Sequence, residues 1–280
     1  MTARAITIGY LYPGIMNGYG DRGNLAAITR RCGWRGIGTD VRELNLGDPV
    51  DADEVDLFIL GNGGEFHQRL VATDLADVKG PGICDAVGEG AALLAVGAGY
   101  ELLGRFYQPS RGVELPGARL FDTWTIQQGA DLTMASATLA EARSGRAIGD
   151  LLVRWDAEIL VGFENHSART YLGPTARPLG RVVAGQGNNG DGSEGVRLGN
   201  AIGTHLRGPC LPRNPVLADF LIRAALQRRY GEAELAPLPD RFENEARAAA
   251  LAPHQGTRLG RGRPARVIHP ARHDPAGAGR

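Results

Sequence analysis

Three loops in this sequence carry residues whose types and spacing could do chemistry. In "VGAGYE", residues 96–101, an apolar strand pattern turns through glycines and becomes a helix pattern. Many hydrolases carry their nucleophile at the apex of such a turn. Here the apex is Gly97, which has no side chain with which to attack a substrate. The other two loops are "GNGGEFHQ", residues 61–68, and "GTHLRGP", residues 203–209.

The elements that must position these loops alternate along the first half of the chain. Strand patterns at 5–12, 55–64 and 91–96 are separated by helix patterns at 21–36, with Asp21 as N-cap, and at 74–90. A further helix is predicted directly after Gly97. Strands separated by helices predict an α/β fold with a mainly parallel central sheet covered on both faces. Ligands of such sheets bind at the carboxyl ends of the strands, where these loops lie.

Shorter β segments with glycine-rich turns are predicted in the second half, at residues 118–126, 149–166 and 181–189. A last helix is predicted to begin after Asn214 and to end at Gly231.

The domain organisation follows from a change in composition near residue 235. Residues 1–235 are predicted to form one domain. Residues 236–280 are rich in Arg, Gly, Ala and Pro and contain few large apolar residues. Such a composition predicts a disordered tail.

Charge and cysteine content limit the functional class. The chain has 31 basic and 31 acidic residues, so composition gives no reason to expect nucleic-acid or membrane-surface binding. The first residues lack the apolar region of a signal peptide, and no later run approaches a membrane span. Cys32, Cys84 and Cys210 are far apart and have no metal-ligand spacing. We therefore expect reduced thiols in a cytoplasmic protein, with Cys32 and Cys84 in its core.

Several separate motifs between Ile6 and Arg229 resemble one protein family. They are "YGDRGN", "LFILGNGG", "VGAGYELLG", "VGFENHSARTYLG", "GQGNN" and "GTHLRGPCLPRNP". Together they resemble class I glutamine amidotransferases of the CobB/CobQ type, and more narrowly the GatD-type glutaminase subunits. The resemblance implies a flavodoxin-like sheet, no cofactor, and a heterodimer with a MurT-like Mur ligase that amidates lipid II or a related carboxylate.

The sequence departs from the family pattern at three positions. The family's nucleophilic cysteine corresponds to Gly97, its glutamine to Glu101 and its histidine to Arg207. A glycine cannot form a thioester, and an arginine stays protonated and cannot act as a general base. The sequence therefore predicts a chain without glutaminase activity. The alternative is an active subunit with a relocated nucleophile, for which Cys210 and His205 are the candidates.

Two further residues are substrate-binding candidates through the resemblance. Gly64 belongs to the glycine loop that would donate backbone N–H groups. Arg146 matches an arginine at the family's glutamine site, where a guanidinium can hold a carboxylate; the other interpretation is a solvated arginine in a turn. Glu101 and Arg207 are predicted to form an ion pair across the vacated site, with the guanidinium partly filling the space of the missing thiol; in the alternative, Arg207 points to solvent.

The cluster "FENHSARTY" contains Glu164, Asn165, His166 and Arg169. Dense polar groups after an apolar run predict a hydrogen-bonded network near a site or interface. Glu164 and His166 also allow a metal interpretation, but no second histidine or carboxylate pair completes a ligand set.

Overall fold

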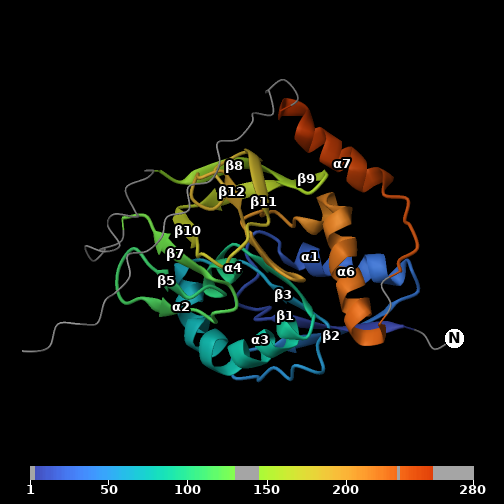
Figure 1. The fold of residues 1–280 in the computed structure, drawn as a ribbon, viewed down its shortest axis with the longest axis horizontal. Coiled ribbons are helices and arrows are strands. Elements are labelled where there is room, and N and C mark those ends of the chain that lie inside the picture. Colours follow the sequence, from blue (N-terminus) through green and yellow to red (C-terminus); the bar gives the residue numbers. More distant parts are fainter. Residues whose placement is uncertain (1–3, 130–144, 232–233, 255–280) are drawn as a thin grey trace, which may run out of the picture.

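A six-stranded sheet forms the centre of the protein in the computed structural model, which describes residues 4–129, 145–231 and 234–254 (Figure 1). Neighbouring strands are parallel except at the β13–β14 edge, which confirms the predicted α/β fold with a mainly parallel sheet. The strand order is β13 (Val196–Leu198), β14 (Ala201–Thr204), β4 (Ala92–Val96), β3 (Leu57–Leu60), β1 (Ala5–Leu11) and β2 (Gly38–Leu44).

Helices cover both faces of this sheet (Figure 1). The strands are apolar on both faces because successive side chains point in opposite directions. In β4, for example, Leu94 packs in the core that includes α1 and α6, whereas Leu93 packs on the opposite side. The helices are α1 (Arg22–Gly33) and α6 (Pro215–Tyr230) on one face, and α2 (Glu65–Asp74), the π-helix η1 (Leu75–Lys79), α3 (Gly80–Gly88) and α4 (Ala98–Leu102) on the other.

Two four-stranded sheets, which contain the predicted β segments of the second half, complete the fold. Their orders are β10 (Ala168–Leu172), β7 (Thr123–Gln127), β5 (Phe106–Gln108) and β6 (Leu115–Pro116), and β12 (Ser193–Glu194), β11 (Gly180–Ala184), β8 (Ala147–Trp155) and β9 (Glu158–His166). A short 3-10 helix, η2 (Leu211–Arg213), precedes α6.

Three elements differ from the sequence prediction. The helix after Gly97, α4, has only five residues, because the chain then enters β5. Helix α2 and strand β2 were not predicted. Strand β2 lies at the sheet edge and is mostly exposed, so its sequence "GTDVREL" lacks the apolar pattern of a buried strand.

Part of the range predicted as a tail is helical. Helix α7 (Arg241–Leu251) begins after Asp240, which pairs with Arg31, and Arg247 pairs with Glu158 at 2.6 Å. A final 3-10 turn, η3 (Ala252–His254), follows, and residues 255–280 lie outside the described range. These contacts tie α7 to the domain, which composition alone does not reveal. The domain boundary at residue 235 stays a prediction.

No helix in the described parts of the chain is both long enough and apolar enough to cross a membrane.

Candidate functional site

The turn at Gly97 joins β4 to α4 at the carboxyl edge of the central sheet. Gly97 has φ 55° and ψ −117°, a backbone conformation that favours glycine. Its N–H donates to the carbonyl of Thr204 at 2.8 Å, and its own carbonyl accepts the N–H of Glu101 at 2.9 Å. The chain therefore has the sharp strand-to-helix turn of a nucleophile elbow although it has no nucleophile there.

Other side chains occupy the place of a side chain at position 97. A Cβ built on Gly97 would lie 2.8 Å from Arg207 Nη2 and 2.9 Å from Arg207 Nε, and closer still to Asn62 Oδ1. The Asn62 oxygen is fixed because it accepts the N–H of Ala98 at 2.8 Å. The geometry thus supports the prediction that the guanidinium fills the space of the missing thiol.

Backbone hydrogen bonds to β9 hold Arg207 in this position. Its N–H donates to the carbonyl of Phe163 at 2.7 Å, and Phe163 N–H donates back at 3.1 Å. The Arg207 side chain is buried, and its Nε has no hydrogen-bond partner among the described residues. The guanidinium carbon lies 5.4 Å from the ring centre of Tyr19, so the guanidinium makes a cation–π contact. The alternative of an arginine that points to solvent is therefore wrong.

Glu101 does not pair with Arg207, which corrects the predicted ion pair. No ion pair within the described ranges joins these two residues; instead, the Glu101 carboxylate accepts a hydrogen bond from Gln68 Nε2 at 2.7 Å. Helix α2, which the sequence did not predict, supplies Gln68. The physical reason is that α2 satisfies Glu101 locally while Arg207 is held over Gly97.

Asp21 lies behind the elbow. It occupies the N-cap position of α1, as predicted, but its side chain makes no capping bond. Its carboxylate instead accepts the N–H of Asn62 at 2.6 Å. Burial raises the pKa of Asp21 to about 6, although the Asn62 hydrogen bond and the charge of Arg207 oppose this rise.

A cavity of about 270 Å³ opens beside Arg207. It brings together four of the predicted site residues, namely Gly64, Glu101, Arg146 and Arg207, and it is also lined by Tyr19, Asn62 and Gln68, which sequence reasoning did not single out. The quoted loop "GNGGEFHQ" contained two of these three residues and was the available signal. Gly97 itself lies beneath Arg207.

Arg146 lies at the rim of this cavity. It is exposed, and its Nε donates to Asn165 Oδ1 at 2.5 Å. This hydrogen bond orients the guanidinium at the rim, which favours the substrate-binding interpretation over that of a freely solvated arginine.

The predicted polar cluster forms a hydrogen-bonded network behind the cavity. Glu164 accepts the N–H groups of Gln186 at 2.6 Å and Gly187 at 3.0 Å. The His166 ring lies 3.5 Å from the Glu164 carboxylate and stacks on His205, with 4.1 Å between ring centres. No group of three potential His, Cys, Asp or Glu metal ligands exists in the described ranges. Glu164 of this cluster therefore holds the backbone at 186–187, whereas Asn165 and His166 also line the cavity.

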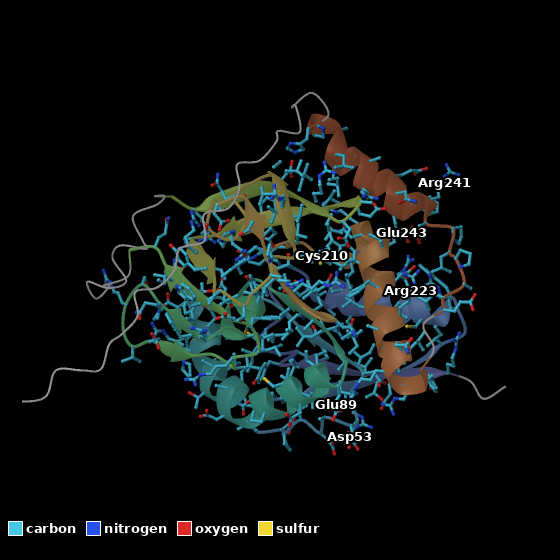
Figure 2. All side chains as sticks on the ribbon, viewed as in Figure 1. Asp53, Glu89, Cys210, Arg223, Arg241 and Glu243 are labelled. Atoms are coloured by element: carbon cyan, nitrogen blue, oxygen red, sulfur yellow. The ribbon has the colours of Figure 1, made fainter. Side chains whose placement is uncertain are left out.

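The three thiols are free, and none lies at the elbow. Cys210, which Figure 2 labels, is buried, and its Sγ lies 3.7 Å from Asn24 Oδ1. Burial raises its pKa to about 12. The ring of His205 lies near a different residue, Thr170, at 3.3 Å, and burial lowers the pKa of that imidazole. Cys210 and His205 therefore do not form a dyad in this structure.

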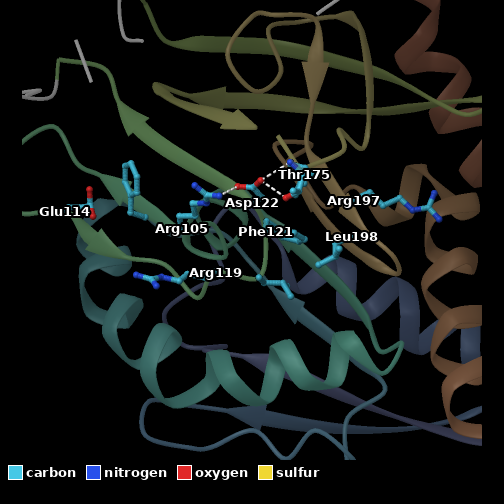
Figure 3. A pocket seen from close by; sticks show the side chains of 12 residues that line it. Arg105, Glu114, Arg119, Phe121, Asp122, Thr175, Arg197 and Leu198 are labelled. Atoms are coloured by element: carbon cyan, nitrogen blue, oxygen red, sulfur yellow. Dashed lines mark hydrogen bonds and ion pairs between the residues drawn. The ribbon is translucent and has the colours of Figure 1, made fainter. Parts of the chain in front are cut away.

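A larger cavity, of about 660 Å³, lies elsewhere, between the β10–β7–β5–β6 sheet and the β13 edge of the central sheet (Figure 3). Its carboxylate Asp122 pairs with Arg105 at 2.6 Å and accepts hydrogen bonds from Thr175 (Figure 3). It contains none of the predicted site residues, and its Asp122 charge is already compensated, so we place the candidate site at the elbow instead.

Comparisons with known proteins agree with the motifs. The profile of the CobB/CobQ-like glutamine amidotransferase domain matches residues 7–215. The lipid II isoglutaminyl synthase (glutamine-hydrolyzing) subunit GatD of Staphylococcus aureus (strain N315) is 33% identical, over 88% of this chain and 93% of that protein. The GatD subunit of Streptococcus pneumoniae (strain ATCC BAA-255 / R6) is 33% identical, over 81% of this chain and 83% of that protein. The solved structure of PurLQS from Thermotoga maritima is 16% identical, with a TM-score of 0.49, over 81% of this chain and 99% of that one.

Proposed function

We propose that this chain, which belongs to the CobB/CobQ-like glutamine amidotransferase family, is a GatD-like subunit that does not hydrolyse glutamine. One observation carries the proposal: the guanidinium of Arg207 and the amide of Asn62 occupy the place where a nucleophile on residue 97 would begin. The substrate amide has nothing to attack it at this position.

Amide hydrolysis through a covalent intermediate needs a nucleophile and a group that moves its proton. Gly97 supplies no nucleophile, and Arg207 stays protonated at every ordinary pH. The thiol of Cys210 is buried and its pKa is raised to about 12, so almost none of it is thiolate at neutral pH. These three facts argue against both the family mechanism and a relocated nucleophile.

The proposed partner is a MurT-like, ATP-dependent Mur ligase. Both GatD relatives are named as subunits of lipid II isoglutaminyl synthase, and the match covers most of their length. We propose a heterodimer in which the ligase activates a carboxylate of a peptidoglycan precursor such as lipid II and takes free ammonia. This chain then supports the ligase structurally rather than through released ammonia.

A glutaminase assay tests the loss of hydrolysis. Purified chain, alone and with its ligase partner, is incubated with glutamine and released ammonia is measured; we expect no ammonia above the background. Gly97→Cys alone also stays at background, because Arg207 crowds the new side chain and cannot move its proton. The double variant Gly97→Cys, Arg207→His removes both obstacles and raises ammonia release at least about tenfold. Ammonia from the unmodified chain that disappears in Cys210→Ala would establish a relocated nucleophile instead.

Co-expression with the ligase encoded nearest to this gene tests the partnership. We expect one co-eluting complex with an interface of about 1,200–2,000 Å². Two separately eluting monomers at micromolar concentration would contradict the subunit proposal.

A further inference from the structure

Arg207 is a buried cation whose side chain has no polar partner in the described parts of the chain. Its side chain is only 6% exposed, and its guanidinium makes no hydrogen bond or ion pair with residues 4–129, 145–231 or 234–254. The ring face of Tyr19 and the charge of Asp21 partly offset its charge. Buried charges in native proteins are paired or hydrogen-bonded, so an unpartnered one that faces a cavity indicates a ligand.

The cavity beside Arg207 has the size of a site for a small molecule. Its volume of about 270 Å³ lies near the lower end of small-molecule pockets, which begin at about 300 Å³. Asn62 and Gly64 add polar groups to its wall.

Three charged groups of the cavity wall are not fully compensated. Arg207 lies at the base and Arg146 at the rim, where only Asn165 holds its guanidinium. Glu101 is buried and accepts a hydrogen bond from Gln68 on Oε2, but no cation in the described ranges pairs with it. Glu65 also lines the cavity, but Arg69 neutralises it at 2.8 Å. The uncompensated wall thus carries two positive charges and one negative charge.

We propose that this cavity binds an α-amino dicarboxylate of the size of glutamate, with one carboxylate on Arg207, the other on Arg146 and the ammonium group at Glu101. This ligand carries the complementary two negative charges and one positive charge. A guanidinium and a carboxylate form two parallel charge-assisted hydrogen bonds, which would satisfy the unpartnered Nε of Arg207. The inference rests on the proposed function, since a site that hydrolysed glutamine would form glutamate as its product instead of selecting it as a ligand.

The same chemistry predicts that glutamine binds more weakly than glutamate. A side-chain amide can give Arg207 only its oxygen and places its NH₂ donors beside the donors of the guanidinium. A carboxylate presents acceptors only. Arg207 at this position therefore favours the acid over its amide.

Isothermal titration of the full-length chain tests the proposal, with L-glutamate, L-glutamine and glutarate as ligands. We expect saturable binding of L-glutamate, and at least tenfold weaker binding of both glutamine, which lacks the second carboxylate, and glutarate, which lacks the ammonium group. Arg207→Gln is expected to weaken glutamate binding at least tenfold. Arg223→Gln, an exposed position on α6 (Figure 2), is the matched control and leaves it unchanged. Thermal melting establishes that each variant is folded.

Three results would overturn the proposal: no saturable binding of glutamate, glutamine binding as tightly as glutamate, or undiminished glutamate binding by folded Arg207→Gln. The wild-type preference for glutamate is decisive even if the variant fails to fold. Ammonia is measured in the same glutamine samples. Its release would refute the proposed function, whereas absent glutamate binding without ammonia release refutes only this inference.

Discussion

Two arginines of this protein are buried to a similar degree but differ in their hydrogen-bond and ion-pair partners. Arg31, on α1, is 3% exposed, and Arg207, at the elbow, is 6% exposed. Arg31 bonds Asp219 through Nε at 2.7 Å and Nη2 at 2.9 Å, and Asp240 through Nη1 at 2.5 Å. Arg207 has no such partner in the described ranges. The difference teaches that burial alone does not make a charge structural; its partners do.

The positions of the two regions explain the contrast. Arg31 joins α1 to α6 and to the start of α7, so its partners come from the chain itself. Arg207 lies at the carboxyl edge of the parallel sheet, where such folds bind ligands. We therefore expect Arg31 to contribute to stability and propose Arg207 as a binding residue, and variants of each can break or sharpen that contrast.

The largest expected effect is that of Arg31→Gln. It leaves the partly buried carboxylates of Asp219 and Asp240 without their common cation, apart from the remaining contact of Asp219 with Arg35 at 2.7 Å. Removal of one partner of a buried pair costs about 3–5 kcal/mol of unfolding free energy. Urea denaturation measures the loss, with Arg223→Gln as the control, for which we expect a change within about 0.5 kcal/mol. A loss of under about 1 kcal/mol would show that the Arg31 cluster is not structural.

Glu194 lies between the cases of Arg31 and Arg207, and its effect on the unfolding free energy depends on pH. Its buried Oε1 accepts hydrogen bonds from Thr204 Oγ1 and from the N–H of His205, each at 2.7 Å, whereas Oε2 has no partner among the described residues. Burial raises its pKa to about 7, above the usual value near 4.5, although both hydrogen bonds lower it. The unfolded chain therefore ionises this carboxyl first. As a result, the wild-type protein loses stability as pH rises from about 4.5 to 7.

Glu194→Gln removes this loss while it keeps the acceptor oxygen. We expect the variant to gain of order 2–3 kcal/mol relative to the wild type between pH 4.5 and pH 8. Urea titrations at several pH values measure the gain. If the unfolding free energies of the two proteins changed with pH in the same way, the Glu194 carboxyl would ionise in the folded protein as it does in water. That result would contradict the raised pKa.

The smallest effect is expected for Arg207→Gln in the absence of ligand. Because the Arg207 side chain has no polar partner within the ranges that the structure describes, its removal relieves an uncompensated buried charge. We expect unfolding free energy to stay unchanged or to rise by about 1 kcal/mol. Urea denaturation provides the measurement. A loss as large as that of Arg31→Gln would mean that the two arginines have the same structural role and that the contrast is false.

The local patterns of the chain predicted most of the fold. The apolar strands at 5–12, 55–64 and 91–96 and the α6 helix formed where their side chains indicated, because both depend on short-range periodicity and on end signals such as Gly231, which has φ 70° at the end of α6. The exposed edge strand β2 and the helix α7 escaped prediction. Strand β2 forms because it pairs with β1, and α7 is held by contacts with Arg31 and Glu158. Neither depends on its own apolar content.

By itself, the sequence determined what the elbow lacks: Gly97 and Arg207 exclude a thiolate and a general base whatever the fold. Only the tertiary structure decided what took their place. In the structure, the Arg207 guanidinium lies over Gly97 and faces a cavity. Glu101 accepts a hydrogen bond from Gln68 and does not pair with Arg207. The physical reason is that residue type alone fixes which reactions a side chain can perform, whereas its hydrogen-bond and ion-pair partners depend on distances between elements far apart in the chain. Helix α2, strand β9 and the 203–209 loop meet only when the sheet is assembled.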